Sequence, residues 1–355
     1  MAAALDVVRR RLRSQRVVGS RLERPADVVK WMGAVQAQDY LGSLWGVALR
    51  TTKATEADVE LAIEERSIVR TWPMRGTLHF VAAQDVRWML RLLAPRIISR
   101  TAGRQRQLGL DAATFTKSRS RLEKALAGGR VLSRPEIYRS LERAGVVTTD
   151  QRGIHILVQL AMQGILCFGA RSGRQPTFAL LDEWLPAAPM LDRDDALGEL
   201  TVRYFTSHGP ATVHDFAWWS GLSLGDARRG LAVAGKRLAD REGAWSAPSR
   251  SAPRRGTVAH LLPAYDEYTV AYRDRSAFLD PSHAVRTRNG IFSAVVIVDG
   301  RIVGTWRRRK AGDAVIVTTD LFDRPSRAAA RALEGALRRY GDFLGLPAAF
   351  ADQVP

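Results

Sequence analysis

The feature that most constrains the fold of this chain is a recurring order of helix and strand signals. Residues 4–17 carry apolar side chains at helical spacing, Pro25 opens a second helix in its first turn, and Thr55 caps a third helix. An extended run over 68–81 follows these helices. Three helices followed by a β-wing is the order of a winged helix, so the sequence predicts one such unit here.

The same order recurs twice further along the chain. Helical patterns over 83–104 and 111–127 precede a helix-turn-helix signal, in which Ser133 and Glu136 form a capping box. Two short strands are expected within 165–181. A third round of helical signals follows at 193–207, 212–220 and 224–240.

The pattern changes after a linker rich in Ser, Pro and Arg over 246–256. Residues 291–306 alternate and turn at an Asp-Gly pair, 314–319 predict a further strand, and 326–344 predict an amphipathic helix. The expected fold is therefore α+β and mainly helical, with three tandem winged-helix units and a β-rich C-terminal unit. We place the four parts at 1–82, 83–190, 191–250 and 251–355.

The charge of the chain predicts a polyanionic partner. Lys and Arg number 54 against 36 Asp and Glu, a formal net charge of +18, and the pI is about 11.0. A coding bias toward Arg replaces Lys but does not by itself create a surplus of positive charge. Double-stranded DNA is the expected partner, because motifs with aromatic residues that stack on RNA bases are missing.

Cysteine usage and hydropathy indicate the compartment. The single cysteine, Cys167, excludes a disulfide within the chain and stands in an apolar run typical of a buried side chain. No apolar stretch approaches the roughly 18 residues of a transmembrane helix. We therefore expect a cytoplasmic, nucleoid-associated monomer with no membrane partner.

Most signatures of enzyme chemistry are missing from the sequence. It contains no phosphate-binding loop, dinucleotide fingerprint or nucleophile elbow. The six histidines have no metal-ligand spacing, so we expect no metal and no cofactor. His208 and His214 are interpreted as structural histidines, and Trp218 and Trp219 as core residues.

One polar segment follows the second predicted helix and contains Gln36 and Gln38. Residues two apart point about 200° away from each other on a helix but share a face in an extended chain. For both glutamines to act together, the chain must leave the helix at this point. The alternative is that one glutamine caps the helix end and the other is solvated.

Two further segments combine polar side chains in patterns that suit DNA contact. In a strand, Arg75, Thr77 and His79 share one face, which favours contact with phosphates and bases, although a solvated edge strand has the same pattern. The run over 263–288 mixes arginines with acids, which favours either backbone contact with DNA or surface ion pairs. Its expected DNA-binding residues are Arg273, Arg275, His283, Arg286 and Arg288.

These segments and their order resemble the AlkZ-like proteins, winged-helix DNA glycosylases that excise or unhook bulky N7-alkylguanine lesions. The resemblance covers about residues 5–345 and implies a C-shaped clamp on DNA, with a hairpin near His283 that probes the duplex. It also implies that Gln36 and Gln38 form the catalytic Gln-x-Gln motif, where a sister branch has Gln-x-Asp. The runs that carry the resemblance are Val35–Gln38, Met74–His79, Leu262–Tyr268 and Tyr272–Ser276.

The expected activity is hydrolysis of the N-glycosidic bond of N7-alkylated, bulky or cross-linked guanine in base excision repair. Such a base leaves as a neutral molecule, so a general acid is largely unnecessary, and two amides suffice to orient water and face the cationic sugar. The alternative is a non-enzymatic winged-helix DNA-binding protein or transcription regulator. A regulator would show preferred sites and no base release.

Overall fold

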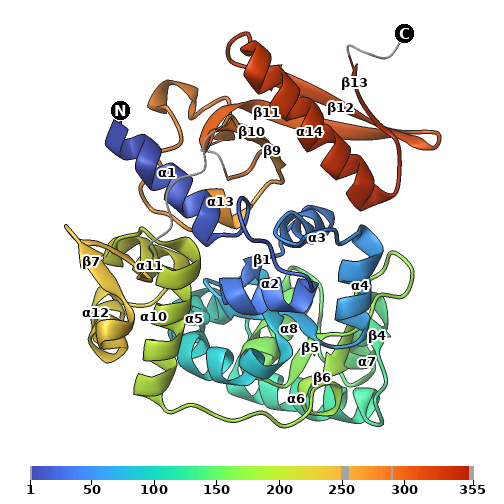
Figure 1. The fold of residues 1–355 in the computed structure, drawn as a ribbon. Helices are drawn as coiled ribbons and strands as arrows, with labels where there is room; N and C mark the ends of the chain where they lie inside the picture. Colours follow the sequence, from blue (N-terminus) through green and yellow to red (C-terminus); the bar gives the residue numbers. More distant parts are fainter. Residues whose placement is uncertain (1, 249–255, 289–290, 352–355) are drawn as a thin grey trace. The chain divides into compact units, whose positions relative to one another are not determined.

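The computed structural model describes residues 2–248, 256–288 and 291–351 of an α+β chain (Figure 1). The middle of the expected linker, residues 249–255, lies outside the described residues. The chain divides into two compact units, which we describe separately. Unit 1 comprises Met1–Glu60, Gly198–Trp219 and Ser223–Pro355, and unit 2 comprises Leu61–Leu197 and Ser220–Leu222.

The N-terminal segment contains one helix more than the sequence predicted. Pro25 lies in the first turn of its helix, as expected, and Gly33 ends that helix with φ 79°. The additional helix begins at Tyr40 and buries most of its residues, so it lacks the polar face that makes a periodic pattern visible. The elements are α1 (Ala2–Ser14), α2 (Pro25–Met32), β1 (Val35–Gln36), α3 (Tyr40–Ala48) and α4 (Glu56–Glu64).

The middle segment of unit 1 is helical and ends in a small hairpin. A cap fixes the start of its second helix, because Thr212 and Asp215 exchange side-chain to backbone hydrogen bonds of 2.9 and 3.1 Å. The helix expected over 224–240 is too long, since Gly235 with φ 52° ends it and leads the chain into a strand. The elements are α10 (Arg193–His208), α11 (Val213–Ser220), α12 (Leu224–Ala234), η2 (Gly235–Arg237), β7 (Ala239–Arg241) and β8 (Ala244–Ser246).

The C-terminal segment forms a five-stranded sheet in the order β13-β12-β11-β10-β9, with α14 packed on it (Figure 1). The predicted hairpin turn is confirmed: Asp299 and Gly300 have φ 49° and 85°, the left-handed values that such a turn requires. The final strand, β13, pairs in parallel with β12 and was not expected. The strands are β9 (Ala259–Leu262), β10 (Val295–Val298), β11 (Arg301–Ala311), β12 (Ala314–Leu321) and β13 (Ala348–Phe350), and the helices are α13 (Glu267–Val270), η3 (Pro281–His283) and α14 (Arg327–Leu344).

Aromatic packing joins α3 to the C-terminal sheet within unit 1. The ring of Trp45 lies 5.1 Å from the rings of both Tyr340 and Phe343 on α14. Its indole N–H also donates to the carbonyl of Leu261 at 2.6 Å, which satisfies a polar group that would otherwise be buried without a partner. The N-terminal and C-terminal segments therefore share one core.

Unit 2 begins with the β2–β3 hairpin and continues with α5, after which a helix, a short strand, two helices and two strands follow in order. The predicted capping box is present, because the backbone N–H of Ser133 donates to Glu136 at 2.8 Å. The elements are β2 (Ile68–Met74), β3 (Thr77–Ala82), α5 (Val86–Gln107), α6 (Ala112–Leu126), β4 (Leu132–Ser133), α7 (Arg134–Arg143), α8 (Arg152–Met162), β5 (Leu166–Phe168), β6 (Thr177–Leu180) and α9 (Leu181–Trp184), with strands ordered β4-β6-β5.

An aromatic cluster fills the core of unit 2. The rings of Trp72 and Phe168 lie 5.0 Å apart, and those of Phe168 and Phe178 lie 4.6 Å apart. Cys167 on β5 is fully buried, as expected, and burial raises the pKa of its thiol to about 12. The thiol is therefore a packing group and not a nucleophile.

Candidate active site

The Gln-x-Gln segment leaves the helix, as a joint role of the two glutamines requires. After α2 ends at Gly33, Val35 and Gln36 are extended, and Asp39 is the N-cap of α3. The side chain of Gln36 is 8 % exposed, and that of Gln38 is exposed. The helix end is closed by Gly33, so neither glutamine acts as its cap.

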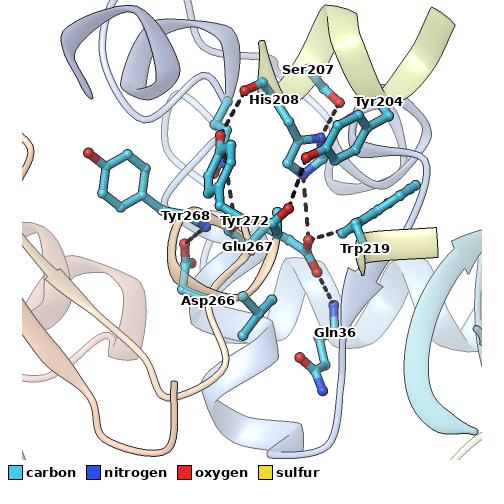
Figure 2. A network of polar contacts seen from close by, with 12 residues as sticks. Gln36, Tyr204, Ser207, His208, Trp219, Asp266, Glu267, Tyr268 and Tyr272 are labelled. Carbon is cyan, nitrogen blue, oxygen red and sulfur yellow. Dashed lines mark hydrogen bonds and ion pairs between the residues drawn. The ribbon is translucent and has the colours of Figure 1, made fainter. Parts of the chain in front are cut away.

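A buried carboxylate holds the backbone of this segment. Glu267 is fully buried, and its Oε1 accepts a 2.7 Å hydrogen bond from the backbone N–H of Gln36. Its Oε2 accepts the indole N–H of Trp219 at 2.9 Å (Figure 2). A buried carboxylate needs such donors, because desolvation strongly disfavours its charge. Glu267 therefore serves as a positioning residue, while the Gln36 side chain extends away from it in Figure 2.

His208 completes the surroundings of this carboxylate. Its Nε2 lies 3.5 Å from Oε2 of Glu267, and its Nδ1 lies 2.8 Å from the hydroxyl oxygen of Ser207. Burial lowers the pKa of His208, and the opposing effect of Glu267 is smaller, so the ring is neutral. The interpretation of His208 as a core histidine is confirmed, but its place beside the Gln36 segment was not foreseen.

A buried ion pair lies next to Glu267 and is linked to it through Gln15. Arg50 and Asp266 form a two-pronged ion pair with N–O distances of 2.8 and 2.9 Å, and both side chains are buried. Burial lowers the pKa of Arg50, but Asp266 outweighs this effect and the pKa is raised, so the guanidinium stays charged. Arg50 also donates to Gln15 Oε1 at 2.7 Å, and Gln15 Nε2 donates to the carbonyl of Glu267 and to the Tyr272 hydroxyl.

Two glycines let α3 approach the segment that carries these acids. A Cβ added at Gly42 would stand 2.6 Å from Asp39 Oδ2 and 3.2 Å from the Cβ of Pro263. A Cβ at Gly46, one turn further on, would stand 3.4 Å from Asp266 Oδ2. Gly42 is the tighter of the two positions, because a Cβ there would crowd Asp39 and Pro263, whereas a Cβ at Gly46 would make an ordinary contact with Asp266.

The second predicted segment belongs to unit 2. Arg75 and Gly76 form the turn between β2 and β3, with φ 55° and 74°, so the expectation that Arg75 shares a strand face with two neighbours is wrong. A two-residue hairpin turn of type I′ requires left-handed backbone at both positions, as found here. Thr77 and His79 do lie two apart on β3, and buried His79 places Nδ1 2.9 Å from the carbonyl of Thr77.

The third predicted segment, residues 263–288, belongs to unit 1, and its first two expected DNA-binding residues contact helix α11. The backbone N–H of Arg273 donates to buried Asp215 at 2.9 Å, while the Arg273 side chain is exposed. Arg275 lies over the ring of Trp218 at 5.5 Å. Trp219 is buried as expected, whereas Trp218 is 43 % exposed, so its assignment to the core is wrong. The Trp218 indole N–H bonds the carbonyl of Val270, which lets the ring lie at the surface.

The end of this segment differs from the expectation of a hairpin near His283. The described residues there form η3 and a series of turns, because Asp280 caps the 3-10 helix at its N-terminus. The ring of His283 stacks on Phe322 with centroids 3.9 Å apart. Exposed Arg286 pairs with Asp320 at 3.0 Å, and Arg288 is exposed.

A basic strand run was overlooked in the sequence. Arg307, Arg308, Arg309 and Lys310 are all exposed on β11, near the turn that joins it to β12. Four consecutive cationic residues at the end of an alternating strand indicate that this part of the strand is exposed, because charged side chains are almost never buried without a partner.

The described part of the chain shows neither a metal-binding group of side chains nor a membrane-spanning helix. No three His, Cys, Asp or Glu side chains within residues 2–248, 256–288 and 291–351 are placed to hold a metal ion. In the same residues, every helix is too short or too polar to cross a bilayer.

Comparisons with known proteins agree with this architecture. A family model described as DNA glycosylase AlkZ-like matches residues 29–343. An interstrand DNA cross-link repair glycosylase from Streptomyces sahachiroi is 28% identical over 308 residues, covering 79% of this chain and 81% of its own. The solved structure of the Streptomyces sahachiroi DNA glycosylase AlkZ matches with a TM-score of 0.79 and 25% identity, covering 98% of this chain and 99% of its own. The chain therefore belongs to the AlkZ-like family of DNA glycosylases.

Proposed function

We propose that this DNA glycosylase hydrolyses the N-glycosidic bond of N7-alkylated guanine in duplex DNA, and that Gln36 and Gln38 carry the reaction. The observation that carries the proposal is the 2.7 Å hydrogen bond from the Gln36 backbone to Glu267, which fixes the extended Gln-x-Gln segment. The name of the Streptomyces relative favours cross-linked or bulky lesions as substrates. Membership of a glycosylase family argues against the alternative of a non-enzymatic regulator.

The chemistry fits a pair of neutral amides. Cleavage passes through an oxocarbenium-like transition state, and N7-alkylation lets guanine leave without protonation. A glutamine carbonyl accepts a hydrogen bond from water and faces positive charge on the sugar without becoming protonated. We assign Gln36 and Gln38 these roles jointly, with Glu267 holding their backbone in place.

We further propose that the scaffold grips DNA through tandem winged helices, with the boundaries 1–82, 83–190, 191–250 and 251–355. The order α6, β4, α7, α8, β5, β6 in unit 2 supports this, because it is the order of a winged helix. We also propose a cytoplasmic monomer that acts on the nucleoid, and the net charge of +18 supports its contact with DNA. The proposed DNA-contacting residues are Arg75, Thr77, Arg273, Arg275, His283, Arg286 and Arg288. His79 was expected among them, but its side chain is fully buried and therefore cannot reach DNA.

Replacing both glutamines by alanine tests the mechanism. The Gln36→Ala/Gln38→Ala protein should bind duplex DNA as the native protein does but should release no base from DNA that contains N7-methylguanine. Gln107→Ala, which removes an exposed amide of α5, is the matched control and should release base normally. Base release by the double variant at the native rate would refute the catalytic assignment.

A further inference from the structure

A cavity of about 460 Å³ lies within unit 1, apart from the Gln-x-Gln segment. It is bounded by α1, the loop that follows α1, the start of β9 and one face of α14. Its size falls in the range of small-molecule sites, roughly 300–1,000 Å³. The residues that line it are Arg9, Leu12, Arg13, Val18, Gly19, Arg21, Thr52, Gly256, Thr257, Val258, Ala259, His260, Asp299, Ala332, Gly335 and Arg339.

The charged groups of this cavity are unbalanced. Four arginines line it against one acid, Asp299, and that carboxylate already accepts the backbone N–H of Val258 at 3.1 Å. Within the described residues, Arg9, Arg21 and Arg339 make no ion pair with a carboxylate. The cavity therefore concentrates positive charge, because the described side chains give Arg9, Arg21 and Arg339 no carboxylate partner.

Two buried donors at the cavity have no acceptor among the described residues: Nε2 of His260 and Nε of Arg339. His260 is 3% exposed, and its Nδ1 faces Nη2 of Arg339 at 3.4 Å. A guanidinium only donates, so Nδ1 is the acceptor and the proton of the neutral ring lies on Nε2. Buried N–H groups without an acceptor are rare, and both of these belong to residues that line the cavity.

The protonation states agree with this geometry. Burial, together with nearby Arg339 and Arg21, lowers the pKa of His260 far below its ordinary value, so the ring is neutral. Burial and the charge of Arg21 also lower the pKa of Arg339 to about 10, and the guanidinium remains charged at neutral pH. An anion placed between Arg21 and Arg339 would relieve their repulsion.

We propose that this cavity is a binding site for a phosphate group, with Arg21 and Arg339 as its donors. Arginine suits this ligand because its N–H groups match the spacing of phosphate oxygens. Two small residues of α14, Ala332 and Gly335, line one wall, and a Cβ at Gly335 would stand in ordinary contact with Nη1 of Arg339 at 3.7 Å. The phosphate is either free or carried by a nucleotide or by the DNA backbone.

Thermal unfolding of the full chain in inorganic phosphate tests the site, with sodium chloride at equal ionic strength as the reference. Phosphate should raise the midpoint of unfolding beyond chloride, because a ligand that binds only the folded state stabilises it. The Arg21→Gln/Arg339→Gln variant should weaken the apparent phosphate affinity by about tenfold or more. Arg331→Gln, an exposed arginine of the same helix outside the cavity, removes charge without touching the site and should retain the effect.

The Gly335→Leu variant tests whether the phosphate effect can be lost without destabilising the fold. Leucine favours helix more than glycine does, and its side chain would extend toward Arg339 and occlude the cavity. This variant should remain folded and lose the phosphate effect. Equal midpoints in phosphate and chloride for the native protein would overturn the proposal, as would an undiminished phosphate effect in the Arg21→Gln/Arg339→Gln variant.

A saturating DNA duplex without a lesion distinguishes the sources of the phosphate. If the backbone occupies the cavity, the duplex abolishes the effect of inorganic phosphate, and the Arg21→Gln/Arg339→Gln variant shows a smaller salt dependence of DNA binding. If the ligand is free phosphate or a nucleotide, the effect persists with DNA bound. These measurements are independent of base release, so failure of the glutamine mechanism and failure of this site are distinguishable.

Discussion

Replacing Glu267 with glutamine isolates the contribution of one buried carboxylate to the geometry of the Gln36 segment. The substitution keeps the size of the side chain but removes its charge and converts one acceptor into an N–H donor. Oε1 and Oε2 accept from the Gln36 backbone and the Trp219 indole at 2.7 and 2.9 Å, so one of these donors would face the new amide N–H. The segment must then shift or leave a buried donor unsatisfied.

The expected loss of stability follows from the two hydrogen bonds that Glu267 accepts from Gln36 and Trp219. An orphaned buried donor costs about 1–3 kcal/mol, and loss of charge from the remaining bond costs about 1 kcal/mol. The free energy of unfolding should therefore fall by roughly 2–4 kcal/mol. Because a displacement of about 1 Å costs an enzyme about 100-fold in rate, we expect base release by the folded Glu267→Gln protein to slow by about that factor.

Urea unfolding and single-turnover base release from DNA containing N7-methylguanine measure the two effects. Trp306→Phe is the control, because it removes another buried indole hydrogen bond of unit 1, to the carbonyl of Leu262 at 2.7 Å, away from Gln36. The control should lose about 1–3 kcal/mol of stability but keep the native rate constant. A Glu267→Gln protein that is destabilised but releases base at the native rate would refute a positioning role for Glu267.

Two further predictions concern pH and the basic strand. The pKa of both His208 and His260 is lowered by burial, so unfolded chains take up protons below about pH 6.5 while the folded chain does not. Stability should be complete above that pH and fall as pH decreases, by up to about 1.4 kcal/mol per pH unit for each histidine. Urea unfolding of His260→Gln should show a shallower decline, and an unchanged decline would contradict this account. Arg307→Gln/Arg309→Gln should weaken duplex binding and reduce its salt slope by up to about two. Binding assays at several salt concentrations measure this slope, and a native slope would exclude the strand from the DNA interface.

Local signals predicted the local structure well. The capping box of Ser133 with Glu136 and the turn at Asp299 formed as expected, because their hydrogen bonds or backbone angles involve residues only a few positions apart. The additional helix α3 escaped prediction, since burial of most of its residues hides the helical period. The turn at Arg75 was mistaken for strand because the conformation of a two-residue turn depends on the pairing of its flanking strands.

The sequence by itself determined that Gln36 and Gln38 stand after a helix, in a strongly basic chain with no metal-binding pattern. Only the tertiary structure decided what holds them. Glu267 lies 231 positions from Gln36, and Asp266 lies 216 positions from Arg50. A buried charge finds its partner through the packing of distant segments, which no local pattern records.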